Sequence, residues 1–167
     1  IGLFLIQVLK LSNAGKIIAV DLDDDKLRLA QKFGADLTSK PDDPKLEMLI
    51  LENTDGRGAD VAFEAVGINP TVQLAIKNVR KGGAVTLVGN LAPSIDLPLQ
   101  SVVTREIKLQ GSCGIAGEYP QVLEMIEKGL VDVDALLSAT APLSEGASWF
   151  KRLYEKEPGL NKVILQP

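Results

Sequence analysis

The chain of 167 residues is 46% hydrophobic and carries a net charge of −4, which suits an acidic globular domain, or part of one, with a substantial core. This acidic balance, without a basic patch interleaved with aromatic side chains, argues against nucleic-acid binding. The apolar opening from Ile1 to Ile6 falls far short of the roughly 20 residues of a membrane span, so no membrane partner is expected.

The sequence contains no histidine and a single cysteine, Cys113. Zinc sites built from His and Cys, Ser-His-Asp triads and Cys-His pairs are therefore excluded within these residues. One cysteine gives no disulfide framework and fits a reducing compartment, so we expect a cytoplasmic protein. Any chemistry must come from a bound cofactor, from carboxylates and lysines, or from protein outside this chain.

Short apolar runs alternate with stretches of helical periodicity, the pattern typical of βαβ units around a parallel sheet. Parallel strands are buried on both faces, so near-continuous apolar runs are expected for them. A first helix is predicted over residues 3–12. The predicted strands cover residues 16–21, 60–66, 84–90, 107–113 and 162–167.

Helices are predicted between these strands. One covers residues 24–34 and ends at Gly34, with an inner face of Leu27, Ala30 and Phe33. The next has Asn69 as its N-cap, Pro70 as its first helical residue and Gly82 at its end. Weaker helices are expected within residues 41–53 and 97–106.

The character of the sequence changes after Cys113. Two amphipathic helices are predicted within residues 117–137 and 144–157, joined by a connection through residues 138–143. Each is expected to bury one apolar face, formed by Val122, Met125 and Ile126 in the first and by Trp149, Phe150 and Leu153 in the second. We therefore expect a sheet domain over residues 1–113 and a C-terminal segment over residues 114–167.

The strand at 16–21 ends on Asp21, which has the position of a ribose-binding acid. Gly2 precedes it by close to the ~20 residues that separate a dinucleotide fingerprint from the acidic residue that binds the adenosine ribose. The second strand of a doubly wound sheet delivers its last side chain to the crevice that the first βα turn reaches. An Asp there accepts hydrogen bonds from both ribose hydroxyls and repels a 2′-phosphate, which favours NAD over NADP.

On this interpretation Gly2 is the last glycine of the fingerprint, and the helix at 3–12 faces the pyrophosphate. We then expect the chain to begin inside the fingerprint, without its first strand. A glycine near a helix start also has a plain packing explanation. The acids Asp23, Asp24 and Asp25 are interpreted as an N-cap and first-turn residues that complement the helix dipole.

The order of these segments resembles the coenzyme-binding half of the medium-chain dehydrogenases, the zinc alcohol and polyol dehydrogenase family. The matching segments are "IG" leading into a helix, "IIAVDLDDDKL", "LAQKFGAD", "GRGADVAFEAVG", "VRKGGAVTLVGN" and "NKVILQP". The resemblance covers essentially the whole chain. It implies an α/β fold, a Rossmann-type doubly wound parallel sheet lacking its first strand, with the C-terminal segment packing on a catalytic domain outside this chain.

The resemblance also implies a set of cofactor contacts. Asp21 would hold the adenosine ribose and Lys26 would contact it too, although a solvated helix lysine is an equal alternative. Lys162 would lie near the pyrophosphate, unless it is an ordinary surface lysine. Cys113 would be a wall residue beside the nicotinamide, or else a plain buried thiol. The other residues implied to line the crevice are Ala65, Val66, Gly67, Val88, Gly89, Asn90 and Ser112.

Chemistry in this family is hydride transfer between a substrate carbon and the nicotinamide, with the alcohol oxygen on a catalytic zinc. The resemblance places the zinc ligands outside this chain, which alone would bind NAD in part without oxidising an alcohol. The segment "SIDLPLQSVVTREIKLQGS" resembles the polyol branch. The edge strand "IKLQGS" implies a homo-oligomer.

Two other functions stay open, and one carboxylate needs an explanation. The chain fits a nucleotide-binding module without turnover, and it fits a methyltransferase whose S-adenosylmethionine ribose binds Asp21, although the order of the later motifs argues against the second. Glu64 lies within an apolar strand, where burial is costly unless the carboxylate is bonded. We favour a structural role, with bonds from the backbone or from a basic side chain, over catalysis.

Overall fold

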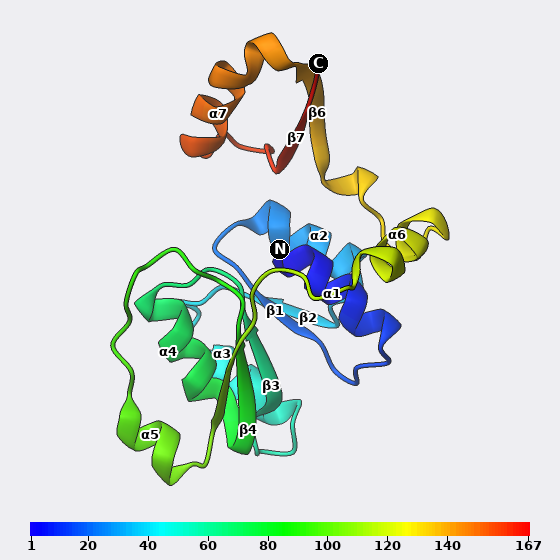
Figure 1. Ribbon diagram of the computed structural model, residues 1–167. Helices are drawn as coiled ribbons and strands as arrows, with labels where there is room; N and C mark the ends of the chain where they lie inside the picture. The colour runs from blue at the N-terminus through cyan, green and yellow to red at the C-terminus, as the bar shows by residue number, and fades with distance from the viewer. The chain divides into compact units, whose positions relative to one another are not determined.

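The computed structural model describes residues 1–167 and divides into two compact units, Ile1–Ala116 and Gly117–Pro167 (Figure 1). None of its helices has both the length and the apolar character that crossing a membrane requires.

The first unit contains two parallel sheets. In one, β1 (Ile18–Val20) pairs with β2 (Leu37–Ser39); in the other, β4 (Val79–Leu87) lies between β3 (Ala59–Glu64) and β5 (Lys108–Gly111). Each pairing is parallel, so each connection between paired strands is a crossover. Parallel strands connected through helices confirm the expected Rossmann-type architecture. Both β1 and β3 are paired on one side only, and the expected lack of a first strand stays a prediction.

The helices of the first unit alternate with these strands as predicted, except that no strand was predicted at the residues of β2 (Figure 1). Asp23 is confirmed as the N-cap of the second helix, since its Oδ1 accepts hydrogen bonds from the backbone N–H groups of Asp25 at 2.8 Å and Lys26 at 3.4 Å. Gly34 follows that helix with a φ of 111°, the left-handed conformation that ends many helices. The five helices are α1 (Gly2–Leu11), α2 (Asp24–Lys32), α3 (Leu46–Glu52), α4 (Asn69–Asn78) and α5 (Leu99–Thr104).

Both ends of α4 differ from the prediction. Asn69 is the first residue of the helix and not its cap, because its side chain is engaged by Asp96: Oδ1 accepts from the Asp96 backbone N–H at 2.7 Å, and Nδ2 donates to Asp96 Oδ2 at 3.1 Å. The helix ends at Asn78, because Val79 already pairs with β3. Gly82 therefore lies within β4 instead of ending the helix.

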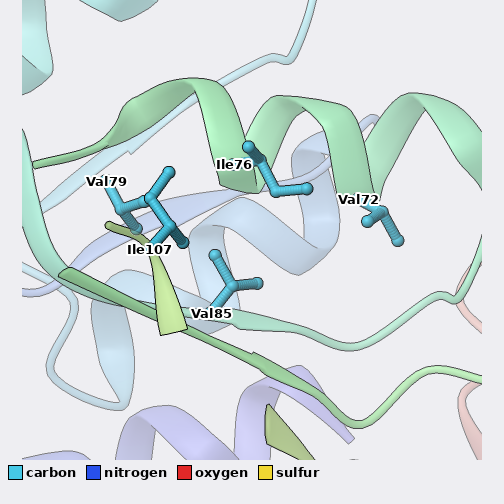
Figure 2. Close-up of a cluster of buried hydrophobic side chains, with 5 residues drawn as sticks. All are labelled: Val72, Ile76, Val79, Val85 and Ile107. Carbon is cyan, nitrogen blue, oxygen red and sulfur yellow. The ribbon is translucent and has the colours of Figure 1, made fainter. Parts of the chain in front are cut away.

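The core of the first unit lies between α4 and the sheet of β3, β4 and β5. Figure 2 shows Ile76 and Val72 on the helix above Val85 of β4. Ile76 is 1% exposed and Val85 is fully buried. Val79 and Ile107 complete the cluster, so the buried face of α4 holds the sheet whose carboxyl ends carry most of the expected cofactor contacts.

The second unit contains α6 (Tyr119–Glu127), β6 (Leu137–Pro142), α7 (Gly146–Tyr154) and β7 (Lys162–Gln166). Residues predicted as a connection form β6, which pairs in parallel with β7. The signal was weak because the inward positions after Leu137 are the small residues Ala139 and Ala141. Two 3₁₀ turns, Asp134–Leu136 and Leu143–Glu145, flank this strand.

The apolar faces predicted for the helices of this unit are only partly buried. Met125, Ile126, Trp149 and Leu153 are half-buried. Val122 and Phe150 are 46% and 71% exposed, which contradicts their assignment to a buried face. Amphipathic periodicity indicates that a helix has an apolar side, but it does not supply the surface that covers it.

Arg152 links α7 to the segment that follows it in the second unit. Its guanidinium lies 3.9 Å from the centroid of the Trp149 ring, and it donates two hydrogen bonds to Glu157, at 2.6 Å from Nε to Oε2 and at 2.7 Å from Nη2 to Oε1. These hydrogen bonds lower the pKa of Glu157 below its ordinary value of 4.5. The ion pair therefore stabilises the folded unit above pH 4.5, and its contribution is lost as the pH falls from 4.5 through the lower folded pKa.

The fluorescence of Trp149, the only tryptophan of the chain, should report the loss of the Arg152–Glu157 ion pair at low pH. We expect its emission to change below pH 4.5, because protonated Glu157 releases Arg152 from its fixed place over the ring. Glu157→Gln should remove most of that transition, whereas Glu155→Gln, on a carboxylate that pairs with Lys151, should keep it. A transition of equal size in the Glu157 variant would show that another group causes it.

Ile76→Ala should leave a cavity between α4 and the sheet. We expect the free energy of unfolding, measured by urea titration, to fall by about 2–5 kcal/mol. Ile115→Ala removes the same atoms from a side chain that is 56% exposed, and should change stability by less than about 0.5 kcal/mol. Equal losses in the two variants would contradict the core described here.

Candidate cofactor-binding site

The segments that follow β3 and β4 meet backbone to backbone at Gly67 and Gly89. A Cβ atom on Gly67 would lie 2.3 Å from the Asn90 nitrogen, and one on Gly89 would lie 2.2 Å from the Gly67 nitrogen. Gly67 also has a φ of 82°, which other residues rarely adopt. Only glycine therefore fits at either position of this contact, which we call the glycine crossing.

Glu64, the last residue of β3, ties the two sides of the glycine crossing together. The residue is 4% exposed, and its Oε1 accepts from the backbone N–H groups of Val66 and Gly67, both at 2.8 Å. The Gly67 N–H also lies 3.0 Å from Oε2. The Glu64 carbonyl accepts from Val88 at 2.8 Å and from Gly89 at 3.0 Å. The structure thus gives this carboxylate backbone partners, as its structural interpretation requires.

Asp21 follows β1, in the other sheet of the first unit, and is half-buried. Its backbone N–H donates to the Ser39 carbonyl at 3.3 Å, which continues the pairing with β2, and its Oδ1 accepts from the Asp23 N–H at 3.0 Å. The carboxylate is therefore held at the carboxyl end of the strand. Its Oδ2 remains available to a ligand.

Gly2 and Lys26, which are also expected to lie near the adenosine end of the dinucleotide, are both exposed. Gly2 is the first residue of α1, and a Cβ there would meet nothing within 4 Å, so the space around this glycine is open. Lys26 lies in the first turn of α2, exposed, with its Nζ 4.0 Å from Asp23 Oδ2. This weak surface pair agrees with a solvated lysine and leaves its side chain free to turn toward a ligand.

Other expected contacts of the first unit fall into two places. Ala65, Val66 and Val88 lie with the glycine crossing. Ser112 and Cys113 follow β5, where the Ser112 N–H donates to the Leu87 carbonyl at 2.9 Å. Cys113 is exposed, which contradicts the buried-thiol alternative, because the chain leaves the sheet at this point.

Lys162 belongs to the second unit, where it begins β7. Its place near the pyrophosphate stays a prediction.

The loop after β4 is tied to the start of α4 by contacts that sequence reasoning missed. Besides the reciprocal pair of Asn69 and Asp96, Gln73 Nε2 donates to the Asp96 carbonyl at 3.3 Å, and the Ala92 N–H donates to the Gly67 carbonyl at 2.8 Å. The sequence pattern predicted Asn69 as a helix cap, and no motif indicated a role for Asp96. These bonds fix the loop that continues from Asn90.

The structure contains no group of three or more His, Cys, Asp or Glu side chains that could hold a metal ion.

Comparison with known proteins identifies the family of the chain. A family model described as zinc-binding dehydrogenase matches residues 1–128. The chain belongs to the zinc-binding dehydrogenase family. Both sheets of the first unit, Asp21 and the glycine crossing all fall within the matched residues.

Relatives of this zinc-binding dehydrogenase include enzymes named for polyols and sugar acids. The chain is 32% identical over 172 residues to the probable D-xylulose reductase A of Emericella nidulans, which covers 100% of this chain and 48% of the relative. It is 32% identical over 142 residues to the L-idonate 5-dehydrogenase of Vitis vinifera, covering 83% of this chain and 39% of the relative.

A solved structure shows the same fold. The zinc dependent alcohol dehydrogenase 2 from Streptococcus pneumonia superposes with a TM-score of 0.90 at 28% identity, over 99% of this chain and 49% of that one. The chain spans about half the length of the proteins it matches.

Gly67→Ala should disrupt the glycine crossing, because the new methyl group would overlap the Asn90 nitrogen in a backbone conformation that alanine disfavours. We expect the free energy of unfolding to fall by more than about 2 kcal/mol. Gly111→Ala, at a position open to solvent, should cost less than about 1 kcal/mol in the same urea titration. A Gly67 variant as stable as the Gly111 variant would refute the close contact.

Proposed function

We propose that this zinc-binding dehydrogenase chain forms the NAD-binding part of an enzyme that oxidises a polyol or another secondary alcohol. The observation that carries the proposal is the carboxylate of Asp21 at the carboxyl end of β1, in the same unit as an accessible N-terminus of α1. In open α/β sheets, ligands bind outside the carboxyl ends of the strands. The 0.90 TM-score over 99% of the chain supports a placement of both sheets like that in a complete dehydrogenase.

Asp21 and α1 suit the adenosine end of a dinucleotide. A carboxylate accepts hydrogen bonds from the two hydroxyls of a ribose, and its charge opposes a phosphate on the 2′ oxygen. The N-terminus of α1 carries partial positive charge and backbone N–H groups that attract a pyrophosphate. Gly2, without a side chain, lets the phosphates approach this end closely. Lys26, one turn into α2, adds a positive charge near the ribose.

The glycine crossing and the end of β5 suit the nicotinamide end. Val66, Gly67, Val88 and Gly89 would form the floor of the crevice. Asn90, Ser112 and Cys113, all exposed beyond their strands, would offer polar groups to the ring and its carboxamide. When bound, NAD supplies a hydride acceptor for an alcohol carbon.

The residues of this chain do not fit a catalytic zinc site, since there is no histidine and no cluster of acidic and sulfur ligands. We therefore assign no step of the reaction to zinc within this chain. The names of the two relatives support a polyol or sugar-acid substrate class. The family match favours the dehydrogenase interpretation over a methyltransferase.

We also propose that the protein is a homo-oligomer. β5 is paired only with β4, so its other edge is open to a strand of a second copy.

Asp21→Ala should weaken NADH binding about tenfold or more, because the loss of a charge-assisted hydrogen bond is worth about 1.5–3 kcal/mol. Its preference for NADH over NADPH should fall at the same time, as the negative charge that opposes the 2′-phosphate is gone. Fluorescence titration of both nucleotides measures the two effects.

Asp25→Ala is the matched control for Asp21, since Asp25 lies on the exposed side of α2 in an ion pair with Arg28. We expect it to bind both nucleotides like the unchanged chain. Unchanged affinity and selectivity in the Asp21 variant would remove its assigned role. Binding of S-adenosylmethionine in place of NADH would overturn the dehydrogenase proposal.

A further inference from the structure

We propose that Glu64 is a positioning residue that holds the glycine crossing in the shape to which the dinucleotide binds. The inference rests on the proposed function of this site as an NAD-binding crevice. It assigns a binding role to a residue that is 4% exposed and faces away from solvent, without making it a group that contacts the cofactor itself.

The carboxylate of Glu64 is fixed by neighbouring backbone groups. Three donor contacts reach its two oxygens from Val66 and Gly67, at 2.8, 2.8 and 3.0 Å. A buried carboxylate is costly unless such bonds replace its water, and buried N–H groups are costly unless an acceptor meets them. The Glu64 carboxylate and the turn after β3 therefore stabilise each other. Without the carboxylate, the Val66 and Gly67 N–H groups would lose their acceptor.

The main chain of the same residue controls the facing segment. The Glu64 carbonyl accepts from both Val88 and Gly89, so one residue sets the turn after β3 through its side chain and the turn after β4 through its backbone. Because a Cβ on Gly89 would lie 2.2 Å from the Gly67 nitrogen, the two turns are in close contact. A shift of the Gly67 peptide must therefore displace Gly89 as well.

This coupling should strengthen dinucleotide binding by preorganising the site. The glycine crossing presents four of the proposed contacts, Val66, Gly67, Val88 and Gly89, and a site already in its bound shape avoids the entropic cost of ordering them on binding. Both oxygens of the Glu64 carboxylate accept bonds from backbone N–H groups, as a structural task requires.

The variants are Glu64→Ala and Glu64→Gln in the 167-residue chain. Alanine removes all three contacts. Glutamine retains one oxygen, which can keep the two bonds at 2.8 Å, but turns an NH₂ donor toward the Gly67 N–H. Asp60→Ala is the matched control, because Asp60 is an exposed carboxylate on the same strand, paired with Arg80 at 2.5 Å.

Two measurements are made on each variant: NADH affinity by fluorescence titration, and amide hydrogen exchange of the chain without nucleotide. We expect Glu64→Ala to weaken NADH binding about tenfold or more and to speed exchange at Val66 and Gly67, while Val85 in the core stays protected. Glu64→Gln should lie between the alanine variant and the unchanged chain in both measurements. Asp60→Ala should match the unchanged chain.

The outcomes separate this inference from the function it rests on. An unchanged chain that binds NADH, with Glu64 variants that bind equally well, would overturn the positioning role. If Glu64→Ala also loses protection at Val85, the folded glutamine variant decides the question, and normal affinity in it would overturn the role as well. An unchanged chain that binds no NADH would refute the proposed function itself, and this inference with it.

Discussion

The carboxyl end of the larger sheet depends on a contact between two backbones that leaves no room for a side chain. Gly67 and Gly89 approach so closely that a Cβ on either would overlap the other segment. Such a contact has no side-chain packing of its own, so hydrogen bonds must hold it. Glu64 supplies them from both its carboxylate and its carbonyl, which makes the end of β3 the anchor for two turns at once.

Two other features of the first unit support this contact. α4 packs Ile76 against Val85 and fixes β4 between its neighbours. Hydrogen bonds between Asn69 and Asp96 attach the loop after β4 to the first turn of α4. One helix therefore contributes its buried face to the core and its N-terminus to the rim of the site. Loops held at both ends in this way suit a ligand that lies along the strand ends.

The two sheets of the first unit carry complementary parts of the proposed site. Asp21 follows a strand of the smaller sheet, and the glycine crossing follows strands of the larger one. Each sheet has an edge, at β1 and at β3, that is paired on one side only. Edges of this kind are rarely left bare in stable proteins. The chain spans about half the length of its relatives. The match to the zinc-binding dehydrogenase family covers residues 1–128, which include both sheets.

The sequence alone determined most of the alternation of strands and helices, the cap at Asp23 and the place of Asp21 at the end of a strand, because each depends on periodicity or on neighbours a few residues away. It did not indicate the short strands β2 and β6. The resemblance of its segment order also identified the family correctly. Tertiary structure decided the rest. The sequence pattern predicted Asn69 as a helix cap, but its side chain binds Asp96 instead, and only the fold brings Asp96 within reach. Likewise, an apolar position such as Phe150 is buried only where another surface covers it, and that depends on distant parts of a protein.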